Sequence, residues 1–316
     1  TPLRPIGVSV FRAEEGSRFP VACLGSRLAT GATSWMEARA LRDRNGATVA
    51  EALARGDGAG GDPVDDPVDD PGQIGPSWLA GVGTFVELHV EQGRHLVDLD
   101  EPVGVASSIW PHGRYRFDFS GEANHAGTTR MEDRHDPMLT YAMTVLAANK
   151  QARVAGERAT FGRVTVEPNG TNAVPQRVTG WLDARASSTE SLLRLVADVE
   201  RMAVDRGGRD GTDVVVTPES VTTEVVFDPD LTRRLATLGA GRRREDGTGD
   251  AWPVLPTAAG HDAGILSAAG IPTAMLFVRN PTGISHSPLE HASMADCLGG
   301  VEALTDVLEL LAGEEP

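Results

Sequence analysis

The stretch from residue 114 to residue 218 alternates strand-like and helix-like segments in an order that few folds accommodate. Strand patterns cover residues 114–120, 160–167, 177–185 and 212–218, and helical patterns cover residues 137–155 and 189–205. The resulting order, βαββαβ, is that of a ferredoxin-like unit. We therefore expect this part of the chain to fold as one inserted domain.

The segments on either side follow a different, α/β pattern. Before the insert we expect a strand at 6–11, a helix near 21–29, helical structure within 35–55 and a strand at 84–90. After it we expect a helix near 231–238, a turn-rich segment at 239–250, a strand near 273–278 and a helical tail at 292–312. The prediction is an α/β protein with a split domain, residues 1–104 and 222–316, and an inserted domain, residues 105–221.

A low-complexity tract covers residues 56–75. It contains the tandem segments Asp62-Pro63-Val64-Asp65 and Asp66-Pro67-Val68-Asp69. Proline and mutually repelling aspartates favour an exposed loop. A row of aspartates also suggests calcium, but the prolines prevent the compact loop of an EF-hand, so we favour a solvated insert.

Charge and hydropathy exclude several classes of partner. A net charge of −16 repels phosphate backbones, which argues against nucleic acid. No stretch approaches the roughly 20 apolar residues that span a bilayer, and the first residues lack the pattern of a signal peptide. Cys23 and Cys297 suggest buried thiols in a reducing compartment rather than a disulfide. We expect a cytoplasmic protein without a nucleic-acid or membrane partner.

Two adjacent carboxylates, Glu14 and Glu15, follow the apolar run at residues 6–11 and precede the turn at Gly16. Neighbouring residues at a strand end point in different directions, so one carboxylate can bind a metal while the other moves protons. Most such pairs in a chain with 45 acidic residues are solvated surface. Which interpretation holds depends on whether the sequence contains further residues that could bind the same metal.

His89 and His286 are candidate partners, each in a strand-end or loop context. A lone histidine is more often structural than ligating. Imidazole nitrogen and carboxylate oxygen together form an ordinary ligand set for zinc or manganese. With Glu15, these two histidines would supply metal ligands and leave a position for water.

Six motifs in register carry a resemblance to the M20-type metallo-amidohydrolases, within them to the allantoate amidohydrolase and N-carbamoyl-L-amino-acid hydrolase branch. They are Glu14-Glu15-Gly16-Ser17-Arg18-Phe19, Glu87-Leu88-His89-Val90-Glu91-Gln92-Gly93, Asn124-His125-Ala126-Gly127-Thr128-Thr129, Asn172-Ala173-Val174-Pro175, Gly260-His261-Asp262-Ala263 and Ser285-His286-Ser287-Pro288. The resemblance covers essentially the whole chain. It implies a split metallopeptidase-like α/β catalytic domain with an inserted ferredoxin-like lid and dimerisation domain, and a homodimer.

The resemblance also implies roles around the reacting bond. Glu14 would be the general base, Glu15, His89 and His286 metal ligands, and His125 the group that stabilises the oxyanion on the attacked carbonyl. Two divalent ions, zinc or manganese, serve the family. His261 resembles a residue that supports the site without ligating metal.

Further positions match residues that hold the substrate. Arg185 would clamp a carboxylate and Asn172 would bind beside it, although a surface ion pair and a turn former remain the alternatives. His112 falls where relatives commonly carry a substrate-contacting glutamine, which weakens any claim about the substrate. Gln92 and Gly283 are lesser candidates because they lie close in sequence to His89 and His286.

One departure concerns residues before Glu14. The family carries upstream a histidine in a Gly-Ser-His-type motif and an aspartate that bridges the two metals, and residues 1–13 contain neither His nor Asp. We expect that the chain lacks a natural N-terminal portion, and that it binds one metal ion weakly or none.

The implied function is hydrolysis of a ureido (carbamoyl) C–N bond in a small ureido acid. Among such acids we expect allantoate to be the substrate, with release of ammonia and carbon dioxide. The nearest alternative is an N-carbamoyl-L-amino-acid hydrolase or β-ureidopropionase. An alternative of another class is a noncatalytic dimeric binding protein with an incomplete metal site.

Overall fold

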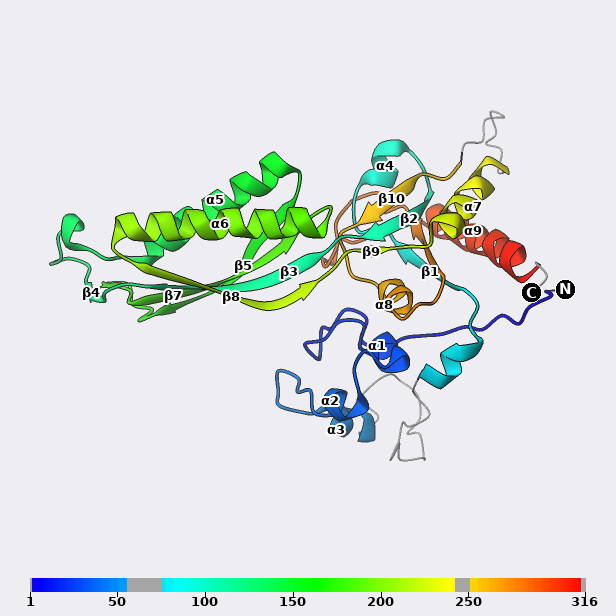
Figure 1. Cartoon of the computed structure of the whole chain (residues 1–316), viewed down its shortest axis with the longest axis horizontal. Coiled ribbons are helices and arrows are strands. Elements are labelled where there is room, and N and C mark those ends of the chain that lie inside the picture. The colour runs from blue at the N-terminus through cyan, green and yellow to red at the C-terminus, as the bar shows by residue number, and fades with distance from the viewer. Residues whose placement is uncertain (1, 56–75, 242–250, 314–316) are drawn as a thin grey trace. The chain divides into compact units, whose positions relative to one another are not determined.

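The computed structural model describes residues 2–55, 76–241 and 251–313 (Figure 1). Within it the chain divides into two compact units. Unit 1 comprises Thr1–Ile109 and Val225–Pro316, and unit 2 comprises Trp110–Glu224. These boundaries lie five and three residues after the predicted ones. The predicted loop at 56–75 and most of the turn-rich segment at 239–250 lie outside the described residues.

Unit 2 is built on a four-stranded antiparallel sheet in the order β5-β7-β3-β8. The strands are β3 (His112–Ser120), β5 (Arg158–Glu167), β7 (Arg177–Arg185) and β8 (Asp213–Thr222). A short ribbon, β4 (Asn124–His125) with β6 (Ala173–Val174), forms a separate two-stranded sheet. The helices α5 (Pro137–Ala155) and α6 (Thr189–Asp210) and the 3₁₀ turn η2 (Met131–Asp133) complete the unit.

Sequence alternation decides which face of this sheet is covered. Along β3, Tyr115, Phe117 and Phe119 are buried and join α5 and α6 in one hydrophobic core. Both helices lie along the same face of the sheet (Figure 1). Asp136 caps α5 through the backbone N–H of Met138, and Ser188 caps α6 through that of Ser191, so each helix begins where the sequence predicts.

Unit 1 contains a mixed five-stranded sheet in the order β1-β11-β2-β10, with β9 paired to β2. The strands are β1 (Phe85–Val90), β2 (Val103–Ile109), β9 (Val225–Val226), β10 (Val254–Thr257) and β11 (Thr273–Val278). Every residue of β11 is buried, as expected for a strand covered on both faces. The sequence had indicated β1 and β11 but not β2, β9 or β10.

Helices cover the two faces of that sheet. The helices α7 (Pro229–Gly241) and α9 (Met294–Ala312) pack with Ala274 and Leu276 of β11. On the opposite face, α8 (Asp262–Ala268) packs with Met275 and Phe277, and the short helix α4 (His95–Leu99) contributes Leu96. Alternate residues of β11 therefore belong to two hydrophobic cores, one on each face of the sheet.

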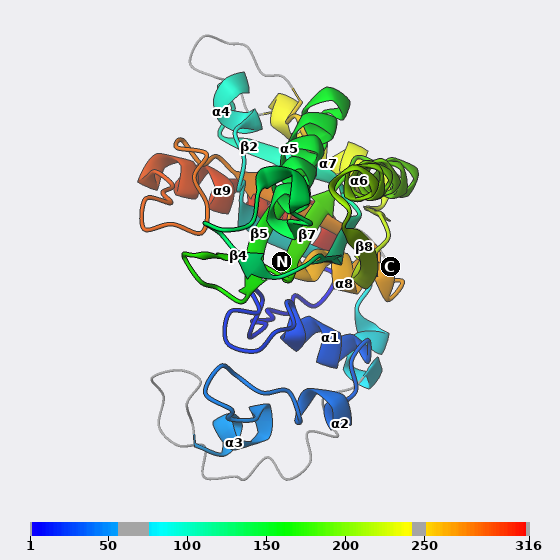
Figure 2. The same ribbon diagram turned by 90° about the vertical axis from the view of Figure 1, so that its left-hand side faces the viewer.

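The first part of unit 1 has a small core of its own. It comprises α1 (Leu24–Thr30), α2 (Trp35–Ala38) and α3 (Val49–Ala54), which lie close together in Figure 2, with η1 (Pro76–Gly81) following. The sequence predicts helical structure within 35–55 interrupted by a turn at Asn45-Gly46, and the structure has two short capped helices there with that turn between them.

Two expectations need correction. Residues 6–11 form no strand: no described strand pairs with them, and Val8 and Val10 are 92% and 87% exposed. Cys23 is buried as expected, but Cys297 is exposed because it lies on the outward side of α9. Among the described helices, none has the length and apolar character to cross a bilayer.

Candidate functional site

Along β1, the side chains of Glu87 and His89 lie on the strand face that packs with α8. Val86 and Leu88 pack toward α7 and α9, whereas Phe85 packs in the core that includes α8. Glu87 and His89 share the side of Phe85, because alternate residues of a strand face the same way. A Glu87 carboxylate oxygen accepts the backbone N–H of Ala263 at 2.6 Å, in the first turn of α8.

His89, Glu14 and His261 form a cluster of possible metal ligands. One ligand atom from each of the three lies within 4.8 Å of the others, and the rings of His89 and His261 are 4.6 Å apart, edge to face. His89 Nδ1 lies 2.8 Å from the carbonyl oxygen of Val90, so Nδ1 carries the proton and donates it there. Nε2 is then the unprotonated nitrogen, which is the form that binds metal.

His261 is placed by α8, whose N-cap it occupies, and only 2% of its surface is exposed. Burial, together with the nearby charge of His89, lowers its pKa to about 3, so the ring is neutral at physiological pH. Among the described residues its Nδ1 has no hydrogen-bond partner, and its Nε2 makes only a 3.4 Å contact with Thr257 Oγ1.

Glu14 and Glu15 stand in different environments although they are neighbours. Glu14 is half-buried, and burial, followed by the charge of Glu15, raises its pKa. Glu15 is exposed, and its Oε2 lies 3.1 Å from Nε2 of His286. His286 holds a left-handed backbone conformation, φ 56°, and its N–H donates to Glu290 Oε2 at 3.0 Å. Glu15 therefore contacts His286, whereas Glu14 lies near His89 without a direct contact, their ligand atoms being within 4.8 Å.

Sequence reasoning did not single out Glu87, Asp262 and Ser26, which surround this cluster. Asp262 accepts a short hydrogen bond from Ser26 Oγ, and burial raises the pKa of Asp262 despite hydrogen bonds from Ser26 and Cys23. Burial also raises the pKa of Glu87, to about 7. The sequence did contain a signal for two of them. Glu87 lies two residues before His89 and therefore on the same strand face, and Asp262 directly follows His261.

Gln92 and Gly283 occupy neighbouring loops of unit 1. Gln92 follows β1 and is half-buried. Gly283 has φ +64°, and a Cβ there would collide with the side chain of Arg94. Glycine is therefore required by conformation and by this close approach.

His125 and Asn172 meet at the β4–β6 ribbon of unit 2. The N–H of Ala126 donates to the Asn172 carbonyl oxygen at 2.9 Å. His125 is exposed, and its Nδ1 accepts the N–H groups of Gly127 and Thr128 at 3.0 and 3.1 Å. Because Nδ1 is the acceptor, Nε2 carries the proton and remains a donor.

His112 and Arg185 are directly opposite each other on β3 and β7. His112 Nδ1 lies 2.8 Å from Thr222 Oγ1. Arg185 donates through Nε and Nη2 to the two carboxylate oxygens of Asp183, at 2.8 and 3.3 Å. The ion-pair alternative for Arg185 is therefore present in the structure, and it also fixes the plane of the guanidinium.

The two groups of unit 2 lie at opposite ends of its sheet. His112 begins β3, and the β4–β6 ribbon lies beyond Ser120, where β3 ends (Figure 1). Eight steps of about 3.4 Å separate His112 from Ser120, roughly 27 Å in all. One small ligand cannot touch both groups within one copy of the chain.

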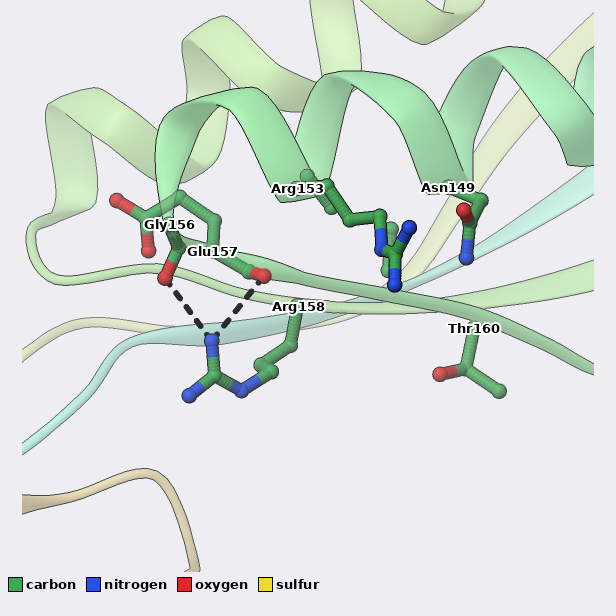
Figure 3. Close-up of a pocket in the computed structure, with 8 residues that line it drawn as sticks. Asn149, Arg153, Gly156, Glu157, Arg158 and Thr160 are labelled. Atoms are coloured by element: carbon green, nitrogen blue, oxygen red, sulfur yellow. Dashed lines mark hydrogen bonds between the residues drawn. The ribbon is translucent and has the colours of Figure 1, made fainter.

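A surface hollow of about 400 Å³ lies elsewhere in unit 2, at the end of α5 (Figure 3). Arg153, Arg158 and Thr160 line it, and Arg158 Nη1 donates to the carbonyl oxygens of Gly156 and Glu157 at 2.9 and 3.2 Å. The hollow contains none of the predicted site residues.

The donor set of unit 1 fits a divalent metal. Carboxylate oxygens and imidazole nitrogens suit zinc or manganese, and a buried imidazole nitrogen without a partner is the atom that a cation would satisfy.

Comparison with known proteins identifies the family of the chain. Residues 1–310 match the peptidase family M20/M25/M40. The chain is 34% identical to an N-carbamoyl-L-amino acid amidohydrolase of Geobacillus stearothermophilus, over 98% of this chain and 72% of that protein. It is 32% identical to an allantoate amidohydrolase of Bacillus subtilis, over 95% of this chain and 69% of that protein.

A solved structure gives the same result for the fold. An amidase of the hydantoinase/carbamoylase family from Burkholderia multivorans superposes with a TM-score of 0.78 at 27% identity, covering 97% of this chain and 70% of that one. The motifs, the α/β fold and these likenesses together show that the chain belongs to peptidase family M20/M25/M40.

Proposed function

We propose that this protein hydrolyses a ureido C–N bond with the help of a divalent metal, and that allantoate is its substrate. The observation that carries the proposal is the proximity of Glu14 to His89, within 4.8 Å, together with the contact between Glu15 and His286. Relatives that hydrolyse carbamoyl groups support it, since both allantoate and N-carbamoyl-L-amino acid amidohydrolases match nearly the whole chain.

Glu14 is the general base in this proposal. Its raised pKa suits a carboxylate that takes a proton from water and returns it to the leaving nitrogen. After the C–N bond breaks, the carbamoyl fragment decomposes to ammonia and carbon dioxide.

Glu15, His89 and His286 would hold the metal. A divalent cation bound there would supply a Lewis acid for the ureido carbonyl and a lower pKa for water. Nε2 of His89 is prepared for this by the hydrogen bond of Nδ1 to Val90. The Glu15–His286 contact brings an oxygen and a nitrogen ligand together.

His125 stabilises the oxyanion that develops on the attacked carbonyl. Two backbone N–H groups occupy its Nδ1, which leaves an Nε2–H to donate. Arg185, whose guanidinium is oriented by its hydrogen bonds to Asp183, binds the substrate carboxylate with His112 next to it, and Asn172 supports the His125 end. Gln92 and Gly283 line the approach to the metal ligands.

Unit 2 serves as a lid and dimerisation domain. Its strand order, β5-β7-β3-β8, supports a ferredoxin-like fold. His125 and Arg185 lie beyond opposite ends of β3, whose backbone spans about 27 Å. This separation supports a homodimer, because two copies can supply both groups to one substrate.

Hydrolysis assays on two substrates test the proposal. Metal-free protein is supplied with manganese or zinc, and ammonia release is measured from allantoate and from N-carbamoyl-L-amino acids. We expect the larger kcat/KM for allantoate and no turnover after chelation. A strong preference for N-carbamoyl-L-amino acids would support the second candidate function, which the 34% identity to such an enzyme favours.

A further inference from the structure

We infer that Asn280 is a positioning residue: its buried side chain holds residues 282–286 in the shape that places His286 in contact with Glu15. The inference rests on the proposed function for the role of His286 as a metal ligand. It concerns a residue that none of the sequence motifs contains.

The side chain of Asn280 bonds to three successive residues of this segment. Its Oδ1 accepts the N–H and the hydroxyl of Thr282, at 3.1 and 2.8 Å, and the N–H of Gly283 at 3.1 Å. Its Nδ2 donates to the carbonyl oxygen of Ile284 at 2.8 Å. Backbone N–H groups only donate, so the two ends of the amide cannot be exchanged. The position therefore uses both the acceptor and the donor of an amide.

Asn280 can fix the segment because it is itself fixed. It follows the end of β11 by two residues, and none of its surface is exposed. Its neighbour Arg279 donates through Nε and Nη2 to the buried carboxylate of Asp296, at 3.0 and 2.8 Å. Asp296 lies in the first turn of α9. The amide is thus anchored to the sheet and to a long helix of unit 1.

The segment needs such an anchor because it contains two residues in the left-handed conformation. Gly283 has φ +64° and His286 has φ 56°. A residue with a Cβ atom adopts this conformation at a cost and keeps it only where surrounding contacts determine it. Glu290 supplies one contact, since its Oε2 accepts the N–H of His286 at 3.0 Å. Asn280 supplies the others, at the turn that precedes His286.

A buried asparagine can also serve stability alone. That role concerns unit 1 as a whole, whereas positioning concerns His286 in particular. Within the described residues no hydrogen bond joins Asn280 to His286, so an effect of one on the other has to pass through the backbone between them. The two roles therefore differ in what they predict for the backbone N–H of His286.

Amide hydrogen exchange of the metal-free protein, followed by NMR, separates the two roles. Asn280→Ala should speed the exchange of the His286 N–H several-fold, because the segment opens more often. Thr48→Ala is the matched control: it removes the N-cap of α3 in the same unit and should leave that rate unchanged. An unchanged rate in Asn280→Ala, or an equal increase in Thr48→Ala, would overturn the inference.

Thr282→Val is a second variant that leaves the buried amide in place. It removes the hydroxyl that donates to Asn280 Oδ1 and that accepts the N–H of Ile284 at 3.2 Å. We expect a smaller increase in the exchange rate of the His286 N–H. If Asn280→Ala does not fold, this variant decides, and an unchanged rate contradicts the inference.

Calorimetric titration with Co²⁺ gives a readout that depends on His286 itself. Asn280→Ala should weaken Co²⁺ binding by about 10- to 100-fold, the usual effect of removing a residue that orients a ligand. In the His286→Ala background the same substitution should have no further effect, because the ligand through which it acts is gone. Equal losses in both backgrounds would assign Asn280 to stability alone.

The exchange measurement requires neither metal nor substrate, so the two proposals can fail separately. Faster exchange at His286 of Asn280→Ala, in a protein that hydrolyses no ureido compound, would refute the proposed function and leave Asn280 as the residue that orients His286. An unchanged exchange rate in an enzyme that hydrolyses allantoate would do the reverse.

Discussion

Two neighbouring glutamates acquire different chemistry from what surrounds them. Glu14 is half-buried beside His89 and its pKa is raised, mainly by burial and then by the charge of Glu15. Glu15 is exposed and contacts His286. A carboxylate with a raised pKa suits proton transfer, and an exposed one beside an imidazole suits a metal.

Replacing Glu14 by glutamine removes the proton acceptor but keeps the shape of the side chain. We expect Glu14→Gln to lower kcat for allantoate by about 100- to 10,000-fold, with KM changed far less. Steady-state kinetics at saturating metal measure this, so that a change in metal affinity does not interfere. Glu200→Gln, an exposed carboxylate on α6, is the control. An unchanged kcat would remove Glu14 from the mechanism.

At the scale of elements, Asp183 on β7 is a charged residue that stabilises unit 2 and also orients Arg185, a proposed substrate-binding residue. Burial tends to raise the pKa of Asp183, but its hydrogen bond and charge interaction with Arg185, with Arg114 and His112 nearby, hold that pKa below the ordinary value of 3.8. The ionised aspartate therefore stabilises the folded unit and orients Arg185.

The depressed pKa fixes the sign of a pH effect. The stabilisation from Asp183 is present above its unfolded pKa, near 3.8, and is lost as pH falls through the lower folded value. We expect Asp183→Asn to lower the free energy of unfolding by about 1.5–3 kcal/mol at pH 7. The difference should narrow toward about pH 3.

Urea titrations of wild type and variant across this range measure the effect. Asp198→Asn removes an exposed ion pair with Arg201 and should change stability by about 0–1 kcal/mol. A pH-independent difference for Asp183→Asn would show that packing, rather than charge, is responsible. Arg185 loses its orientation in the same variant, so KM should rise.

At the scale of the whole molecule, the positions of the proposed substrate-binding groups within unit 2 are the reason for proposing a homodimer. His125 and Asn172 stand at one end of the sheet of unit 2, and His112 and Arg185 at the other. The backbones of the two groups are separated by the length of β3, roughly 27 Å, which is too far for one small ureido acid to reach both. The proposed homodimer, in which each site draws on both copies, would bring the two groups to one substrate.

Mixing two inactive variants tests this arrangement. His125→Ala and Arg185→Ala should each be nearly inactive alone. After subunit exchange, half of the dimers are mixed and each mixed dimer has one intact site, so about a quarter of wild-type activity should return. Ammonia release from allantoate measures the recovery. Absence of recovery, with exchange verified by mass, would show that each site draws on one copy only.

The sequence alone determined what depends on local patterns. The order βαββαβ, the helix starts at Pro137 and Thr189, and the strands β1, β7 and β11 follow from alternation and capping, which act between near neighbours. The motifs also indicated Glu14, Glu15, His89 and His286 as one site.

Tertiary structure decided the rest, because pairing and burial depend on residues far apart in the chain. Residues 6–11 have a strand-like sequence but no described partner strand, and residues 6–10 remain exposed. The short strands β9 and β10 exist only through their pairing with β2. His261 is buried beside His89 where α8 packs on β1, and its Nδ1 finds no hydrogen-bond partner in the part of the chain that the structure describes; no local pattern encodes that contact.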